Sequence, residues 1–242
     1  MRLLAVSAGV AVVPSLLSAC DPPPGDRPAD LRMARLADIS LGITTDGRRL
    51  LRFTTVIVNV GEGPFELHGS RPAGSSTMSV EQQVYDADGG SRVVQTPASM
   101  YFSGDGHNHW HVRDLESYEL VRQDNGHRVG TGAKHGFCFW DNTRFELWRP
   151  SAPQVPVYGG CGVAADTSVE IGLSVGWGDR YGATLPDQYI DVTGLSTGHY
   201  RLRATADAAG WFVEGDNGNN ATWVDLRLRR DRVDVEGYGP SA

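Results

Sequence analysis

The chain has 242 residues, and its 29 acidic side chains outnumber its 22 basic ones, which gives a formal net charge of −7. A hydrophobic fraction of 40% with 21% charged residues is typical of a globular chain and excludes a disordered one. The acidic balance argues against nucleic acid as a partner, because a phosphate backbone is bound by a basic face. The 30 glycines and 13 prolines favour many turns over long helices.

Residues 1–19 have the features of a secretion signal. The apolar run from Leu3 to Leu17 is too short, and too interrupted by glycine and proline, for a transmembrane helix. The sequence Leu17-Ser18-Ala19-Cys20 is similar to the lipobox of bacterial lipoproteins, which predicts cleavage before Cys20 and lipidation of its thiol. An ordinary signal peptide cleaved nearby is the alternative. Proline-rich residues 20–29 are then an exposed tether, and we expect a folded domain outside the cytoplasm, held to a membrane only by the lipid.

From residue 30 to residue 230, apolar residues recur mostly with a period of two, which is typical of β-strands. Hairpin turns are expected at Asp46-Gly47 and at Asp86–Gly90. This pattern predicts an all-β fold, a single antiparallel β-sandwich-like domain with long loops and little helix, followed by a C-terminal tail at 231–242. The expected strands lie at residues 35–44, 49–59, 80–85, 92–95, 107–121, 167–175, 188–192, 200–206 and 221–228.

The chain has three cysteines. If Cys20 carries lipid, Cys138 and Cys161 remain as a pair in an oxidising compartment, which predicts a disulfide; two free buried thiols are the alternative. The second of these cysteines lies in residues 143–166, the longest irregular stretch, which is either a functional loop or a covering for the core.

Three of the seven histidines, His107, His109 and His111, alternate along one segment. In an extended strand they share one face, and a bend would let their imidazoles converge on one ion. Three neutral imidazoles with open coordination positions suit copper, zinc or iron, and copper has the highest intrinsic affinity of the divalent ions. A solvated histidine-rich strand is the alternative, but we expect a metal site.

Lys134 is the only lysine, and the other 21 of the 22 basic residues are arginines. Genomic base composition explains the arginine excess. A lysine usually lies in solvent at the surface. The alternative is that this position requires a primary amine, because arginine cannot supply one as a nucleophile.

Taken in chain order, these motifs resemble the lysyl oxidase family. The alternating histidines are similar to the family's copper motif, and Gly132–Cys138 is similar to the segment whose lysine enters the family's cofactor. Asp179–Ala183 is similar to the segment that supplies the partner tyrosine. The likeness covers roughly residues 30–228, with the motifs in the family's order.

The resemblance implies a copper ion on the three histidines and a lysine tyrosylquinone formed from Lys134 and Tyr181. It implies that dioxygen oxidises primary amines, either small amines or lysine in peptides and proteins, to aldehydes with release of hydrogen peroxide and ammonia. Asp114 is a candidate general base, with a structural carboxylate as the alternative. Tyr189 is a second phenol near Tyr181 in the sequence, and we expect it in the core.

Residues 214–220 concentrate oxygen donors in one segment, which by itself is typical of a turn. In the lysyl oxidase family, a similar Glu-x-Asp-x-x-Asn-Asn loop resembles a calcium site that an Asp-Leu pair at the start of the domain completes. The residues implied for a structural Ca²⁺ are Asp30, Leu31, Glu214, Asp216, Asn219 and Asn220.

Two other functions stay open. A non-enzymatic, copper-binding surface lipoprotein keeps the histidines but gives Lys134 and Tyr181 no joint role. A three-histidine zinc hydrolase would use a metal-bound water as its nucleophile, would work without oxygen and would release no peroxide. Only the oxidase hypothesis requires Lys134 and Tyr181 to lie close together in the fold.

Overall fold

The computed structural model describes residues 22–103 and 107–242. The predicted signal at 1–19 and the lipidation site Cys20 lie outside these residues, so both stay predictions. The described residues form eighteen β-strands and no α-helix, which confirms the predicted all-β class. In this part of the chain, no helix is long and apolar enough to cross a bilayer.

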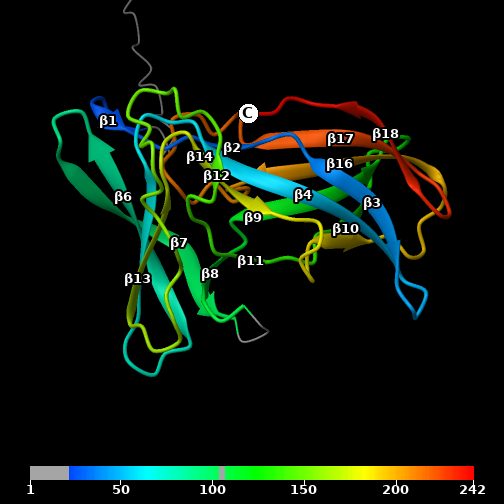
Figure 1. The fold of residues 1–242 in the computed structure, drawn as a ribbon, viewed down its shortest axis with the longest axis horizontal. Coiled ribbons are helices and arrows are strands. Elements are labelled where there is room, and N and C mark those ends of the chain that lie inside the picture. The colour runs from blue at the N-terminus through cyan, green and yellow to red at the C-terminus, as the bar shows by residue number, and fades with distance from the viewer. Residues whose placement is uncertain (1–21, 104–106) are drawn as a thin grey trace, which may run out of the picture.

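The strands pair antiparallel in three sheets, as Figure 1 shows. The seven-stranded sheet has the order β11 (Gly136–Phe137), β8 (Trp110–Arg113), β7 (Ser91–Phe102), β6 (Thr77–Asp86), β5 (Phe65–Ser70), β13 (Ser168–Leu173), and β1 (Asp26–Arg27) pairs with β6. The five-stranded sheet has the order β10 (Arg128–Thr131), β9 (Glu116–Arg122), β16 (Gly198–Ala206), β17 (Ala221–Leu228), β18 (Val233–Tyr238). The six-stranded sheet has the order β12 (Thr143–Arg144), β14 (Trp177–Tyr181), β4 (Arg49–Asn59), β15 (Tyr189–Asp191), and β2 (Leu31–Met33) and β3 (Ala37–Ile43) pair with β4.

The five- and six-stranded sheets pack on each other and enclose much of the core. In Figure 1, β4 crosses the strands of the five-stranded sheet, and β2 contacts β16 and β17. Phe53 of β4 and Tyr118 of β9 meet edge to face with ring centroids 5.1 Å apart. The seven-stranded sheet joins this core through Phe65, whose ring contacts those of Phe139 and Phe212.

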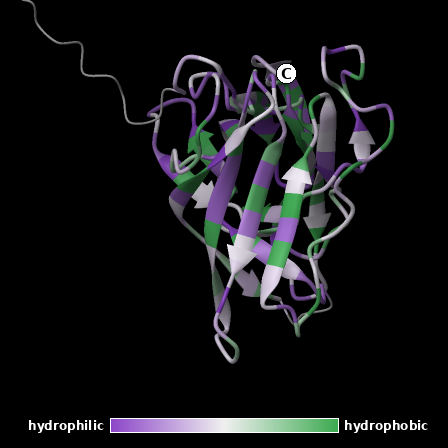
Figure 2. Ribbon diagram, turned by 90° about the vertical axis from the view of Figure 1, so that its left-hand side faces the viewer, coloured by the Kyte–Doolittle hydropathy of each residue, from purple (hydrophilic) through white to green (hydrophobic). Residues whose placement is uncertain are grey.

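Alternation of buried and more exposed residues follows the strands, as a period of two requires. Every second residue of β17 is buried, and Figure 2 shows alternating hydrophobic and hydrophilic bands along neighbouring strands. Strand β4 does not alternate in this way, because residues on both of its faces are buried or partly buried. This central strand pairs with β2 and β3 on one edge and with β14 and β15 on the other, so neighbouring strands cover both of its edges.

The predicted long strand at 107–121 is wrong in one respect, because the chain changes sheets inside it. Strand β8 pairs with β7, whereas β9 pairs with β16. The break lies at Asp114, whose φ of 54° is in the left-handed region that ends an extended run. The apolar alternation continues across this break, so periodicity alone did not reveal it.

The two predicted ends of the domain also differ from the structure. The predicted tail at 231–242 contains β18, which pairs along β17 from Val224↔Tyr238 to Leu228↔Val233. The predicted tether at 20–29 contains β1, in which Asp26 pairs with Asp86. Both segments are held as edge strands, where one-sided packing leaves only a short alternating pattern.

Candidate active site

Three imidazoles converge where the chain enters β8. His111 lies in β8, while His107 and His109 precede it, and the His109 amide donates a hydrogen bond to the His107 carbonyl oxygen at 2.7 Å. The ligand atoms of all three side chains lie within 4.8 Å of one another. The rings therefore converge through a turn before the strand, and not because all three stand on one straight strand.

Lys134 is buried, so the surface position usual for a lysine is wrong here. It lies in the loop between β10 and β11, where the Ala133 amide donates to the carbonyl oxygen of Tyr189 at 3.0 Å. The Lys134 side chain is 2% exposed, and its Nζ donates to Asp187 Oδ2 at 3.2 Å. The only lysine of the chain thus points into the protein with a carboxylate beside it.

Tyr181, the last residue of β14, lies next to Lys134. The Lys134 Nζ is 5.2 Å from the centroid of the Tyr181 ring, and the Tyr181 hydroxyl donates to the carbonyl oxygen of Cys138 at 2.9 Å. Burial raises the pKa of Tyr181 well above its usual value, and the charge of Asp179 raises it further. The structure therefore brings together the two side chains that a tyrosylquinone cross-link would join.

The histidines, Lys134 and Tyr181 line one cavity of about 400 Å³. Its wall also contains Asp179, two residues before Tyr181 on the same face of β14. Burial raises the pKa of Asp179 to about 7, although Asn142 donates a hydrogen bond to its Oδ1. A carboxyl group with such a pKa can take up and release a proton near neutral pH. In the sequence, only the i, i+2 spacing from Tyr181 marks Asp179 as a member of the site.

Asp114, the predicted base, lies elsewhere. Its Oδ1 accepts a hydrogen bond from His135 Nδ1 at 2.6 Å, and both side chains are exposed. It lines a different cavity, which contains none of the three clustered histidines. The reason is the break between β8 and β9, which turns Asp114 away from the face that a continuous strand would have given it. Its placement favours the structural alternative.

Comparison with known proteins agrees with the arrangement of these residues. The family model for lysyl oxidase matches residues 76–237, which include the histidines, Lys134 and Tyr181. The chain belongs to the lysyl oxidase family. It is 31% identical over 122 residues to human protein-lysine 6-oxidase, and 30% identical over 122 residues to the pig protein of the same name. It is 26% identical over 186 residues to zebrafish lysyl oxidase homolog 3A.

The match covers only part of these relatives. It takes in 50% of this chain and 26% of the human protein, and 50% of this chain and 44% of the pig protein. For the zebrafish protein it takes in 77% of this chain but 20% of the relative. The relatives are therefore roughly two to five times as long as the part they share with this lysyl oxidase family member.

The three histidines fit a copper ion in both chemistry and spacing. Nitrogen ligands about 2 Å from a common ion are at most roughly 4 Å apart, and the observed limit of 4.8 Å is close to that. Imidazole is a ligand that copper accepts readily, and the cavity leaves space beside the histidines for a further ligand. The residues present therefore fit the metal that the family implies.

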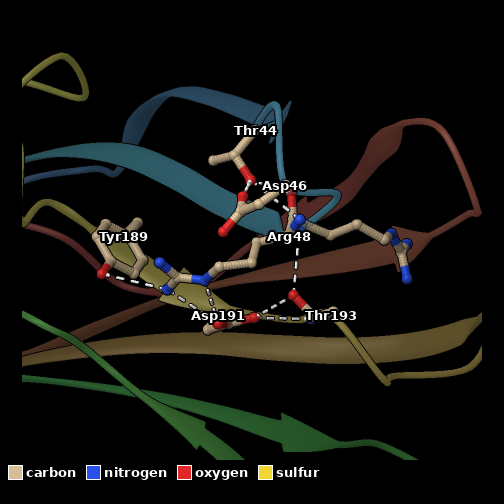
Figure 3. A network of polar contacts seen from close by, with 7 residues as sticks. Thr44, Asp46, Arg48, Tyr189, Asp191 and Thr193 are labelled. Atoms are coloured by element: carbon tan, nitrogen blue, oxygen red, sulfur yellow. Dashed lines mark hydrogen bonds and ion pairs between the residues drawn. The ribbon is translucent and has the colours of Figure 1, made fainter.

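Tyr189, the second phenol, lies outside this cavity. Its hydroxyl accepts a hydrogen bond from Arg48 Nη2 at 3.4 Å, and Arg48 also pairs with Asp191 Oδ2 at 3.0 Å (Figure 3). The Arg52 guanidinium lies 5.4 Å from the centroid of the same ring. Tyr189 is only partly buried, so the expected core position is wrong, because two guanidinium groups hold the ring at the surface.

The predicted disulfide between Cys138 and Cys161 is present. It joins the segment after β11 to the long loop at 143–166, and the Cys161 carbonyl oxygen accepts a hydrogen bond from the Trp110 amide at 3.0 Å. The loop both covers the core, through buried Tyr158, and lines the histidine cavity through Gly160 and Cys161. The stretch therefore covers the core, as one interpretation expected, and it also lines the candidate site, which leaves a functional role as a prediction.

Replacing both Cys138 and Cys161 by serine should lower the free energy of unfolding by about 3 kcal/mol, because the unfolded chain loses a cross-link. Urea denaturation followed by tryptophan fluorescence measures this change. The wild-type protein with its disulfide reduced is the matched control and should lose a similar amount. A double variant as stable as the oxidised protein would contradict the prediction.

The residues implied for calcium also come together. Glu214 Oε2 accepts a hydrogen bond from the Leu31 amide at 2.6 Å, and its Oε1 accepts one from Asn220 Nδ2 at 2.8 Å. Asn219 Nδ2 donates to Asp30 Oδ2 at 3.2 Å.

Three oxygens, Asp30 Oδ1, Asn219 Oδ1 and Asn220 Oδ1, are buried and accept no hydrogen bond from any residue in 22–103 or 107–242. Asp216 is close enough to raise the pKa of Asp30, but its Oδ1 accepts from the Gly218 amide.

Proposed function

We propose that this protein is a copper- and quinone-dependent amine oxidase that converts primary amines, including lysine side chains of peptides or proteins, to aldehydes. The observation that carries the proposal is the distance of 5.2 Å between Lys134 Nζ and the Tyr181 ring centroid, in a cavity lined by three histidines. The names of the relatives, protein-lysine 6-oxidase, support the substrate class. Neither the copper-binding lipoprotein nor the zinc hydrolase gives this pair a function.

In this proposal His107, His109 and His111 hold copper, and Lys134 and Tyr181 form the lysine tyrosylquinone. The quinone would supply the electrophilic carbonyl and the electron sink for amine oxidation, with dioxygen as the terminal oxidant and hydrogen peroxide and ammonia as products. The chain's own residues position the reacting groups. The Cys138 carbonyl oxygen fixes the phenol by its hydrogen bond.

Asp179 is the group that we assign to proton transfer. It lines the same cavity as Tyr181, and its raised pKa of about 7 suits a base that takes a proton from the substrate carbon and later releases it. Asn142, which also lines this cavity, donates to Asp179 and so orients the carboxylate. Burial of Tyr181 and Lys134 keeps bulk water away from the reacting groups.

A quinone stain on protein loaded with copper in air tests the proposal. Wild-type protein should stain, and the Tyr181→Phe variant should not, because it lacks the phenol that becomes a quinone. Tyr189→Phe is the matched control and should stain like the wild type, since that ring lies outside the cavity. Wild-type protein that binds copper but does not stain would favour the non-enzymatic lipoprotein. Zinc-loaded protein that catalyses a hydrolysis without oxygen would favour the hydrolase.

We also propose that the protein is exported and anchored by a lipid on Cys20. The support is the sequence Leu17-Ser18-Ala19-Cys20 after an apolar run. A disulfide within the folded domain is consistent with an oxidising compartment. Metabolic labelling with a radioactive fatty acid should mark the wild-type protein and not the Cys20→Ser variant.

A structural calcium ion at Asp30, Glu214, Asp216, Asn219 and Asn220, next to Leu31, completes the proposal. The unpartnered carboxylate and amide oxygens support it, because these are ligands that Ca²⁺ prefers. We expect one calcium per chain by elemental analysis, and a stability gain of about 2.7 kcal/mol at a free calcium concentration 100 times the dissociation constant. The Glu214→Gln variant should lose this gain, and thermal melting with and without a chelator measures it. Wild-type protein that binds no calcium would refute the site.

A further inference from the structure

Three carboxyl groups lie around the buried ammonium group of Lys134; two of them are buried, and the side chain of Asp187 is 38% exposed. Asp187 lies 3.2 Å from Lys134 Nζ, and the charge of Lys134 also lowers the pKa of both Glu116 and Asp179. Glu116 is 1% exposed and Asp179 is 2% exposed. Before any cross-link forms, Lys134 is therefore the cation that these three carboxyl groups share.

A second cavity, of about 380 Å³, reaches Lys134 from another side. Lys134 is the one residue that lines both this cavity and the histidine cavity. Tyr118, Trp211, Ala208 and Ala209 give the second cavity an apolar wall, and buried Glu116 lines it as well. An elongated molecule with an apolar stem and one charged end fits such a lining.

Two carboxylate oxygens in this region lack donors. Glu116 Oε1 and Asp187 Oδ1 are buried and accept no hydrogen bond from the described residues. The other Glu116 oxygen accepts from the Tyr118 hydroxyl at 2.8 Å. Burial raises the pKa of Glu116 to about 8 even with the charge of Lys134 nearby, so this carboxyl group is ionised above about pH 8, where a cation beside it stabilises the charged form. A buried carboxylate oxygen without a donor is unusual and indicates a missing partner.

The remaining charged groups of this cavity are paired with each other. Arg128 Nη1 bonds to Glu119 Oε1 at 2.8 Å, and His135 Nδ1 bonds to Asp114 Oδ1 at 2.6 Å. Neither pair offers a spare cation to Glu116. Among the described residues that line this cavity, Lys134 is the cation left for Glu116.

The next step rests on the proposed function, because cross-link formation removes that cation. Overall, the Tyr181 side chain, the Lys134 amine and two molecules of dioxygen give the cross-linked quinone, one water and one hydrogen peroxide. A C–N bond replaces a ring C–H bond, and the proton of the former ammonium goes to solvent. The nitrogen is then conjugated with the ring and carries no charge, so Glu116 and Asp187 lose their partner.

We propose that Glu116 and Asp187 bind the ammonium group of the amine substrate after the cross-link has formed, in the role that they serve for Lys134 before it. The substrate enters through the second cavity, with its alkyl stem against Tyr118 and Trp211. The site therefore selects primary alkylammonium ions, the lysine side chain among them, over neutral alcohols of the same length. Before the cross-link forms, the ammonium group of Lys134 occupies this site, and cross-linking removes that charged group from it.

Binding of n-butylammonium chloride to the Lys134→Met variant tests this assignment without any quinone. The variant removes the ammonium, keeps most of the apolar stem and cannot form the cross-link. Calorimetric titration at about pH 9, where an alkylammonium ion with a pKa near 10.4 keeps its proton, should show saturable binding to one site per chain. Metal-free wild-type protein, which retains Lys134, should bind at least tenfold more weakly, and n-butanol should not bind to either.

Two double variants locate the binding groups. Adding Glu116→Gln or Asp187→Asn to Lys134→Met should each weaken binding at least tenfold, whereas adding Asp166→Asn, which lies outside this cavity, should leave binding unchanged. Circular dichroism and thermal melting confirm that each variant is folded, and Lys134→Gln replaces Lys134→Met if the latter is not. Equal binding by wild type and Lys134→Met, or binding indifferent to both carboxyl substitutions, would overturn the inference. A quinone stain on copper-loaded wild-type protein tests the oxidase proposal separately.

Discussion

Replacing Lys134 by arginine should reduce amine oxidation by about a thousandfold or more, because a guanidinium group cannot add to an oxidised ring as an amine does. Arginine keeps the positive charge beside Asp187, so the fold and the copper content should change little. Peroxide release with a primary amine measures the activity. This substitution removes the one amine of the chain that lies beside Tyr181.

Peptide mass analysis of the same samples gives a second result that does not depend on activity. In copper-loaded wild-type protein, the peptides that contain Lys134 and Tyr181 should appear joined, with one oxygen gained and four hydrogens lost. In the Lys134→Arg variant both should remain separate. Oxidase activity in that variant, or a wild type whose two peptides stay unlinked despite full copper loading, would contradict the assignment of these residues.

Replacing Asp141 by alanine should lower the free energy of unfolding by about 4 kcal/mol, the largest effect on stability that we expect from one polar residue. Asp141 is 3% exposed. Its Oδ2 accepts hydrogen bonds from the Val157 amide at 2.8 Å and the Tyr158 amide at 3.3 Å, and its Oδ1 accepts one from the Ser174 amide at 2.8 Å. Alanine would leave these amide groups without an acceptor, and each unpaired group costs about 1–3 kcal/mol.

Urea denaturation measures the effect of Asp141→Ala, and Asp166→Ala is the matched control. Asp166 also accepts a hydrogen bond from a loop amide, that of Val163 at 2.7 Å, but this bond is exposed. The control should therefore cost less than about 1 kcal/mol. Similar losses in the two variants would show that Asp141 does not hold the loop at 143–166 in place.

Local patterns in the sequence were sufficient to predict the strands and several site residues. Alternating hydrophobicity predicted the bounds of β4, β16 and β17 nearly to their ends, because each of these strands buries at least one of its faces in the core. The three histidines and the two cysteines were visible because metal binding and disulfide formation require particular residue types. The lone lysine was visible only through composition.

Features that depend on tertiary placement could not be predicted. Asp187 and Glu116 lie far from Lys134 in the sequence, and no local pattern marks a carboxyl group that will meet a buried ammonium. The change of sheet at Asp114 depends on one residue with a positive φ, and aspartate adopts this conformation often enough to give no warning. This break is also why Asp114, a candidate general base because it follows the last histidine by three residues, lines a different cavity from the histidines.

The position of Lys134 and Tyr181 also affects how the molecule withstands denaturation. Lys134 follows a strand of the five-stranded sheet, and Tyr181 ends a strand of the six-stranded sheet. A covalent bond between them would join the two packed sheets and close a loop of roughly 50 residues. By the loss of chain entropy in the unfolded state, such a bond would raise the free energy of unfolding by about 4 kcal/mol. Cross-linking would then raise the thermal stability of the protein, and heating after copper loading would precipitate chains without the cross-link while cross-linked chains stay in solution.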